Sequence, residues 1–384
     1  MLDETAYAEL DARLASVDAE LRRRYSGEQY TRQPVHTLSV PADLFGPGVL
    51  REYGRLVRRT VAEHGPLPFE PEIIARVLDK LDREPVEDLR IDFADGYGVR
   101  DDAEEDAAAR STANALRSGD CPPFFGLRCK SLEEPTRRRA VRTVDLFLDA
   151  LGPPPPGFVI TLPKVSLVEQ VEAMVILCEH LEKAHGLPEV SLRFEIQVET
   201  PLAILGVDGV ATVALLIRAA AGRCVGLHCG TQEYSTGVGI AAEFAGLDHP
   251  ASSHAKAVAQ LAVAGAGIRL SEGSSQVLPV GDTAAVQSAW EVHAGLVRHS
   301  LERGFYQGWD MHPAQLPTRF GATFTFFQQA APAAATRLSR HLSRPGTAEP
   351  ATVRALARFL LRGVDCGALD ESSLEFDRST LERL

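Results

Sequence analysis

Short apolar, β-branched segments alternate along the chain with longer segments in which apolar residues recur every three or four positions. The short segments are typical of buried strands, and the longer ones are typical of helices that bury one face. We predict strands at 35–40, 88–93, 124–129, 158–163, 191–199, 224–229, 266–271 and 305–312. We predict helices at 4–24, 49–63, 71–81, 103–117, 134–150, 167–185, 207–220, 251–263, 282–303, 313–333 and 351–362.

About eight consecutive strand–helix units predict a parallel sheet that closes into a barrel. A doubly wound open sheet is the alternative, but the one glycine-rich segment, "GVGIAA" at 237–242, does not join a strand directly to a helix. We therefore predict an α/β protein with a TIM (β/α)8 barrel at 35–335. An N-terminal helical arm at 1–34 precedes the barrel, and a C-terminal helical extension at 336–384 follows it. Within 321–350 we expect helix followed by a flexible linker.

The acidic composition restricts the classes of partner. The chain has 52 acidic and 40 basic residues, which gives a formal net charge of −12. This balance argues against a general nucleic-acid binder, which needs a basic face. No apolar stretch is long enough for a transmembrane helix, and the first residues lack the order of a signal peptide. The six scattered cysteines indicate reduced thiols. We expect a cytoplasmic protein with no nucleic-acid and no membrane partner.

Polar residues follow many of the predicted strands at their carboxyl ends. In a parallel barrel these ends share one rim, where enzymes of this fold place their chemistry. The residues on this rim are Asp92, Asp95, Arg128, Lys164, Gln197, Glu199, Glu233 and His312. The alternative for Glu233, which lies in a predicted loop after 224–229, is an ordinary solvated carboxylate.

Glu199 and Glu233 are predicted to follow adjacent strands. Two close carboxylates repel each other unless a cation lies between them, and hard oxygen ligands suit Mg²⁺ or Mn²⁺. Arg128 offers a planar fork for a substrate carboxylate. The alternative for Arg128 is a structural ion pair with Asp92 or Asp95, because buried arginines are usually paired.

Seven segments occur in an order that resembles the HpcH/HpaI aldolase and citrate lyase β-subunit (malyl-CoA lyase-like) family. The resemblance covers about 35–320 and rests on "LSVPADLF", "RIDFADGYGVRDDAEEDAAARSTANAL", "LRCK", "TLPKVSLVEQV", "IQVETP", "CGTQEYSTGVGI" and "GWDMHPAQL". It implies a metal-dependent TIM barrel that forms or breaks a carbon–carbon bond next to a carbonyl group.

The resemblance also implies roles for residues of the rim. Glu199 and Glu233 correspond to the metal ligands. The implied catalytic residues are Arg128, Asp92 and Asp95, of which the two aspartates would organise metal-bound water or act as acid and base. The implied substrate-binding residues are Arg128, Gln197, Lys164 and His312.

Three features depart from the family pattern. Glu233 stands where the family has Asp, and one extra methylene moves a carboxylate by roughly 1.5 Å. Ala94 stands where the citrate lyase branch has Glu. The segments before 35, at 65–87 and after 335 exceed a minimal barrel, so they are candidates for a lid or an interface.

Together these features predict a carbon–carbon lyase or aldolase that acts on a 2-oxo acid or an acyl-CoA thioester through a metal-stabilised enolate. The expected cofactor is Mg²⁺ or Mn²⁺, and a homo-oligomer is expected. The sequence does not choose between the two substrate classes, and it has no compact basic patch for the phosphates of CoA. Two alternatives stay open: a barrel without catalysis that binds a small anionic ligand, and a metal-dependent isomerase or phosphotransferase that acts on an oxo acid.

Overall fold

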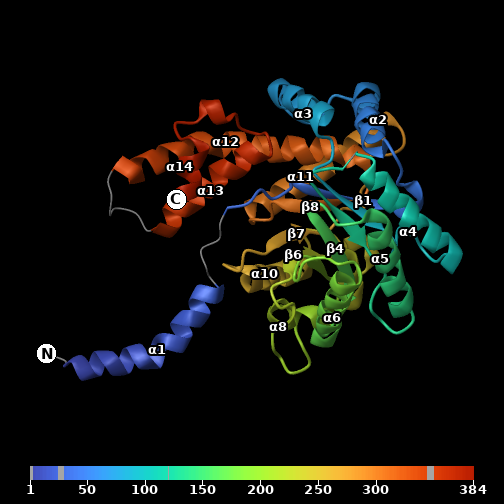
Figure 1. Ribbon diagram of the computed structural model, residues 1–384. Helices are drawn as coiled ribbons and strands as arrows, with labels where there is room; N and C mark the ends of the chain where they lie inside the picture. The colour runs from blue at the N-terminus through green and yellow to red at the C-terminus, as the bar shows by residue number, and fades with distance from the viewer. Residues whose placement is uncertain (1–2, 25–29, 120, 344–349) are drawn as a thin grey trace.

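The computed structural model describes residues 3–24, 30–119, 121–343 and 350–384. Eight parallel strands follow one another around a closed barrel (Figure 1). They are β1 (His36–Pro41), β2 (Asp88–Asp92), β3 (Phe124–Arg128), β4 (Phe158–Val165), β5 (Phe194–Val198), β6 (Cys224–Cys229), β7 (Arg269–Glu272) and β8 (Gln307–Asp310). Each lies where a strand was predicted, so the TIM barrel is confirmed.

The barrel closes because β1 pairs with both of its neighbours. Leu38 is in register with Leu89 of β2 on one side and with Asp310 of β8 on the other. The largest errors in the strand bounds concern β5 and β7, which each begin three residues later than predicted. Val190 has a positive φ of 59°, so the chain turns there and joins the sheet only at Phe194.

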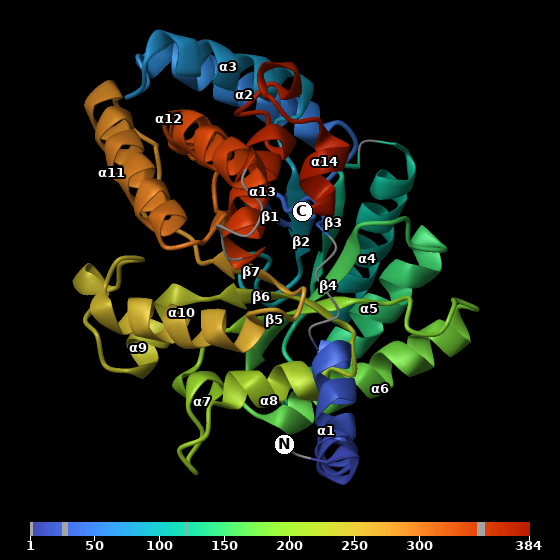
Figure 2. The same ribbon diagram turned by 90° about the vertical axis from the view of Figure 1, so that its left-hand side faces the viewer.

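The described helices comprise those that pack around the outside of the barrel, together with an N-terminal arm and a C-terminal extension (Figure 2). They are α1 (Glu4–Arg24), α2 (Val49–His64), α3 (Pro71–Arg83), α4 (Asp102–Arg117), α5 (Arg137–Leu151), α6 (Val168–Ala184), α7 (Pro201–Ile204), α8 (Thr212–Ala219), α9 (Thr231–Gly237), α10 (Pro250–Val263), α11 (Thr283–Glu302), α12 (Leu316–Ser343), α13 (Pro350–Asp365) and α14 (Arg378–Arg383). Asp101 and Asp282 cap α4 and α11 by accepting hydrogen bonds from backbone N–H groups of the first turn. No described helix is both long and apolar enough to cross a membrane.

Charged and polar side chains from the strands meet in a buried network. Arg90 of β2 forms ion pairs with Asp88 on its own strand and with Glu195 of β5. Its Nε also donates to Thr161 Oγ1 of β4 at 3.0 Å. These groups are almost completely buried, and because each has a partner the cost of removing them from water is offset. TIM barrels usually fill their interior with aliphatic side chains, so this one is unusually polar.

The apolar core is formed by alternate strand residues together with the inner faces of the helices. Ile91, Leu127, Ile160, Ile196 and Leu227 come from five successive strands and are fully buried. Alternation along each strand therefore separates the apolar residues from the charged ones, which is the period-two pattern of the sequence.

The C-terminal extension begins within a long helix. The helix α12 runs without a break to Ser343, so the predicted boundary at 335 falls inside it. Residues 344–349, where the predicted linker would lie, are outside the described residues. The helices α12, α13 and α14 share an apolar cluster that includes Leu338, Leu360 and Leu381. In Figure 1 these helices lie together to one side of the barrel. The arm and the extension outside the barrel are thus both helical, as predicted.

Candidate active site

A tight turn after β2 is built around the carboxylate of Asp92. Its Oδ1 accepts a hydrogen bond from the backbone N–H of Ala94 at 2.8 Å, and its Oδ2 accepts one from Gly96 at 2.9 Å. A Cβ atom at Gly96 would lie 2.7 Å from Oδ2, so the turn requires glycine there. The buried carboxylate of Asp92 therefore fixes the loop that carries Asp95.

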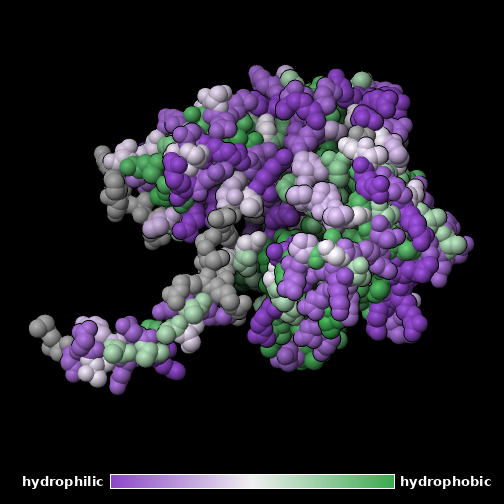
Figure 3. All heavy atoms as spheres, in the orientation of Figure 1, coloured by the Kyte–Doolittle hydropathy of each residue, from purple (hydrophilic) through white to green (hydrophobic). Residues whose placement is uncertain are grey.

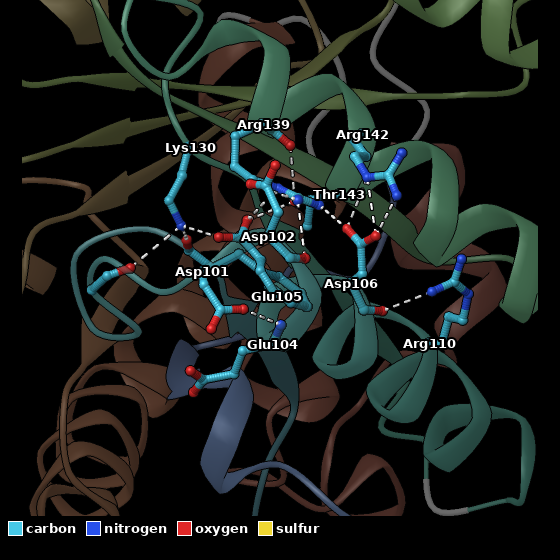
Figure 4. A network of polar contacts seen from close by, with 12 residues as sticks. Asp101, Asp102, Glu104, Glu105, Asp106, Arg110, Lys130, Arg139, Arg142 and Thr143 are labelled. Carbon is cyan, nitrogen blue, oxygen red and sulfur yellow. Dashed lines mark hydrogen bonds and ion pairs between the residues drawn. The ribbon is translucent and has the colours of Figure 1, made fainter.

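Lys130 also holds this loop, and Figure 4 shows its contact with Glu105. Its Nζ donates to the carbonyl oxygen of Phe93 at 2.7 Å and to Glu105 Oε2 at 2.7 Å. Glu105 is completely buried in α4, and its other oxygen accepts from Thr143 Oγ1 of α5. The loop is thus tied to two helices, which restricts the positions that Asp95 can reach.

Arg128 ends β3 and joins three rim residues. Its Nε donates to Gln197 Oε1 at 2.8 Å, and its Nη2 donates to Asp95 Oδ2 at 2.7 Å. Its Nη1 lies 3.4 Å from Asp92 Oδ1. Although burial works to lower the pKa of Arg128, the charges of Asp92 and Asp95 raise it, so the guanidinium is always charged. The ion pairs expected as the alternative role are present. A guanidinium has five N–H donors, however, so at least one stays available for a substrate oxygen.

Asp95 and Lys164 form an ion pair at the more open side of the cluster. Lys164 Nζ lies 3.1 Å from Asp95 Oδ1, and both side chains are nearly half exposed. Burial works to raise the pKa of Asp95, but Arg128 and Lys164 lower it below the ordinary value. Asp95 is therefore an anion at neutral pH, and it is suited to accept a proton rather than to donate one.

Glu199 follows β5 and is 1% exposed. Its Oε1 accepts a hydrogen bond from the backbone N–H of Lys164 at 2.5 Å, while its Oε2 has no hydrogen-bond partner among the described residues. Burial raises the pKa of Glu199 to about 7, because the opposing attraction of Arg128 is smaller and the charge of Glu233 adds to the increase. A buried carboxylate oxygen without a partner is costly. This oxygen is the strongest sign of an absent ligand in the cluster.

Glu233 lies in the first turn of α9 and is exposed. A loop was predicted here. The short helix was missed because seven residues carry too little apolar periodicity to identify it. Gly230, which precedes α9, makes room for Glu199: a Cβ atom at Gly230 would lie 2.6 Å from the Cβ of Glu199 and 3.0 Å from its Oε2. The glycine lets the end of β6 lie directly against Glu199.

These groups were tested for their fit to a divalent cation. Among the described residues, no group of three or more His, Cys, Asp and Glu side chains gathers closely enough to enclose a metal ion. Mg²⁺, however, commonly binds through one or two protein carboxylates, while water and substrate supply the other ligands. Glu199 has an unpartnered oxygen and feels the charge of Glu233, so this pair fits such an open site.

His312 has a different environment from the carboxylate cluster. It caps the short helix Pro313–Gln315, where its Nδ1 accepts from the backbone N–H of Ala314 at 3.2 Å. Burial lowers its pKa, so the ring is neutral at pH 7. In this structure His312 acts as a helix cap, and its contact with a substrate stays a prediction. Gln197, in contrast, lies within the cluster through its bond to Arg128.

Two buried residues near the cluster were not predicted. The rings of His228 in β6 and Trp309 in β8 stack with centroids 4.0 Å apart. His228 Nδ1 and Trp309 Nε1 have no hydrogen-bond partner among the described residues. Burial lowers the pKa of His228 to about 3, so its ring is neutral. Because strand residues alternate between faces, the sequence "LHCG" places His228 on the same face as Gly230, and this signal could have identified it.

Comparison with known proteins gives one family and a set of similar structures. A family model described as "Domain of unknown function (DUF6986)" matches residues 14–384. No curated protein matches the chain. A citrate lyase from Burkholderia xenovorans LB400 superposes with a TM-score of 0.61 at 19% identity, over 93% of this chain and 99% of the other.

Two further structures are similar at lower scores. The protein CitE from Mycobacterium tuberculosis, in complex with magnesium, acetoacetate and coenzyme A, gives a TM-score of 0.53 at 15% identity, over 87% of this chain and 99% of the other. The Haloferax volcanii malate synthase, in a magnesium and glyoxylate complex, gives 0.51 at 14% identity, over 84% and 97%. At these identities the likeness confirms the barrel fold.

Proposed function

The chain belongs to the family described as Domain of unknown function (DUF6986), and we propose that it is a metal-dependent carbon–carbon lyase or aldolase. Its substrate would be a 2-oxo acid or an acyl-CoA thioester, and the bond formed or cleaved would lie next to the carbonyl group. The cofactor would be Mg²⁺ or Mn²⁺. Two of the similar structures named above support the proposal: CitE is a complex with magnesium, acetoacetate and coenzyme A, and the malate synthase is a complex with magnesium and the 2-oxo acid glyoxylate.

One observation carries the proposal: the buried, unpartnered Oε2 of Glu199 at the rim of the barrel. Packing alone gives no reason to bury a carboxylate oxygen without a partner. The charge of Glu233 adds to the cost, and a divalent cation would remove it for both residues. Glu199 and Glu233 would therefore hold the cation.

The other residues of the cluster would bind the substrate and move a proton. When bound, a divalent cation polarises a carbonyl oxygen. This favours cleavage of a carbon–carbon bond, or removal of a proton, at the carbon next to the carbonyl group. Arg128 would donate its remaining N–H to the carboxylate or to the developing oxyanion of the substrate. Asp95 is anionic and partly exposed, so it would accept the proton from the hydroxyl group of the aldol or from the adjacent carbon. Lys164 would keep Asp95 in place and add positive charge for an anionic substrate.

Exchange of substrate protons with solvent tests the chemistry without knowledge of the second substrate. Pyruvate and acetyl-CoA are incubated with the enzyme in D₂O, and loss of the methyl signals is followed by NMR. Exchange is expected with Mg²⁺ or Mn²⁺ and should stop with EDTA. It should survive in enzyme that has been treated with pyruvate and borohydride and then desalted, because borohydride attaches the substrate to the protein only through an imine. Glu199→Gln should lose the exchange, whereas Glu243→Gln, an exposed carboxylate after α9, should keep it.

Three outcomes would count against the proposal. Exchange that persists in EDTA but is lost with borohydride would indicate imine chemistry at Lys164. Exchange that Glu199→Gln leaves unchanged would remove the metal site from the mechanism. Failure of a panel of oxo acids and thioesters to exchange would favour a barrel that binds an anionic ligand without catalysis.

A further inference from the structure

The helix α1 leaves five apolar side chains in solvent. It has 21 residues and extends away from the rest of the chain (Figure 1). The space-filling view shows apolar residues along its surface (Figure 3). Their exposed fractions lie between 46% and 54%, and they are Tyr7, Leu10, Leu14, Val17 and Leu21. Single exposed apolar residues are common on proteins, but five on one helix indicate a surface that another element covers.

The spacing of these residues is that of a coiled coil. The intervals along the chain are three, four, three and four residues, which is the a/d pattern of a heptad repeat over about two heptads. The helices around the barrel bury their apolar stripes; in α3, for example, Ile73, Val77 and Leu81 are buried. In proteins most of the stability of a helix comes from packing of its apolar face and not from helix propensity, so a partner on this face would stabilise α1.

The charges beside the stripe distinguish between the possible arrangements of two α1 helices. In a parallel pair, the residue just before Leu14 on one helix faces the residue just after Val17 on the other. Arg13 therefore lies against Asp18 of the second copy, and the twofold symmetry gives this ion pair twice. In the antiparallel register that aligns the apolar residues, Arg13 faces Glu20, and this pair is attractive. Asp11 then faces Asp18, and this pair is repulsive. Each of the two pairs also occurs twice. Only the parallel arrangement has attraction without matching repulsion.

We propose that α1 is a dimerisation helix, which forms a parallel two-stranded coiled coil with α1 of a second copy of this chain. Leu14 would lie at the centre of the pair, with Leu10 and Val17 in the layers on either side. Two identical helices in parallel register form a closed twofold assembly, so the contact would produce dimers and not chains. Both barrels would then lie at the same end of the coiled coil, beyond Arg24.

The mass of the full-length protein in solution tests the contact. Multi-angle light scattering at about 50 µM should give a dimer for the natural sequence and a monomer for Leu14→Asp, because a charge at a central layer is not tolerated. The matched control is Ala12→Asp, which adds the same charge on the opposite face of α1 and should stay dimeric. The thermal midpoint of the barrel should be unchanged in both variants.

Cysteine cross-linking tests the direction of the helices. In a Cys121→Ser background, Leu10→Cys should form a disulfide-linked dimer on mild oxidation, whereas Ala12→Cys should not. Cross-linking only in a mixture of Leu10→Cys and Leu21→Cys proteins would contradict the parallel arrangement. A monomeric natural protein would overturn the proposal. In a monomeric protein, a lower thermal midpoint for Leu14→Asp would show that α1 packs on its own barrel. An unchanged midpoint would indicate that a different protein is the partner of α1.

Discussion

The backbone N–H of Lys164 donates a 2.5 Å hydrogen bond to Oε1 of Glu199, and Lys164 holds this position with a left-handed φ of 54°. The pairing of β4 with β5 shifts register between Leu162 and Val165, so the backbone of Lys164 turns out of the regular ladder. An L-residue pays a conformational cost there. The contact leaves only Oε2 of Glu199 without a partner, so the strained residue sets which oxygen faces the proposed cation.

Substitutions of Lys164 should separate its backbone from its side chain. Lys164→Gly and Lys164→Ala both lose the ion pair with Asp95, but glycine adopts a positive φ without strain. Lys164→Gly should therefore be the more stable variant by roughly 0.5–1 kcal/mol. Urea denaturation of the two variants measures the difference. Equal free energies of unfolding would show that the backbone at Lys164 is not strained in solution.

The barrel was predictable from sequence because short apolar strand segments alternate regularly with longer helical segments along the chain. Arg128 and Glu199 were placed at the ends of β3 and β5 because strand ends of a parallel barrel share a rim. The fold brings both near Asp95, as expected. The assignment of Glu233 to a loop failed because α9 is too short to produce a recognisable period.

The partners of each rim residue could not be predicted from sequence. The choice of Gln197, Asp92 and Asp95 as partners of Arg128 depends on side-chain directions within a few ångströms. The left-handed conformation of Lys164 depends on a register shift that no residue type signals. Trp309 lies in a buried strand, where an aromatic ring looks like ordinary core, whereas the alternation of residues along β6 could have identified His228.

The stability of the metal-free protein should fall as pH rises from about 4.5 to about 7. The pKa of Glu199 is raised from 4.5 to about 7 in the folded protein, so the folded state binds an extra proton in this window. The stabilisation is complete below the unfolded pKa and is lost as pH rises through the folded value, by about 3 kcal/mol at most. Urea denaturation in EDTA across this range measures it. Glu199→Gln, which cannot titrate, should lack this part of the slope, and an identical slope would refute the assignment.

The affinity for Mn²⁺ should rise with pH over the same range in which the stability of the metal-free protein falls, because both depend on the ionisation of Glu199. Metal binding requires the ionised form of Glu199, so the association constant should rise about tenfold per pH unit below pH 7 and level off above it. Calorimetry in two buffers of different ionisation enthalpy should show that close to one proton is released per ion at pH 6. Glu199→Ala should lose the stabilisation by metal. Binding that is as tight in this variant as in the natural protein would exclude Glu199 as a ligand.

Glu233 should affect Glu199 through its charge. Glu233→Gln removes the repulsion that helps to raise the pKa of Glu199, so that pKa should fall. The same substitution removes a proposed ligand, so Mn²⁺ should bind at least tenfold more weakly. Glu233→Asp, which restores the residue of the resembled family, should bind more tightly than Glu233→Gln. A pKa that falls without any loss of affinity would show that Glu233 is a charged neighbour and not a ligand.

Arg128→Lys should impair both stability and activity because a single ammonium cannot replace the guanidinium. Lysine keeps the positive charge but cannot reach Gln197, Asp92 and Asp95 together. At least one buried partner would then lose its hydrogen bond, with a cost of about 1–3 kcal/mol in the free energy of unfolding. Loss of a donor to the substrate oxyanion should lower kcat/KM by about 10²-fold or more. The control Arg138→Lys changes an exposed arginine of α5 and should alter neither quantity.

The two roles of Arg128 can be separated by measuring proton exchange well below the thermal midpoint of the variant. A variant that is less stable but exchanges substrate protons at the natural rate would leave Arg128 with the structural ion pairs alone.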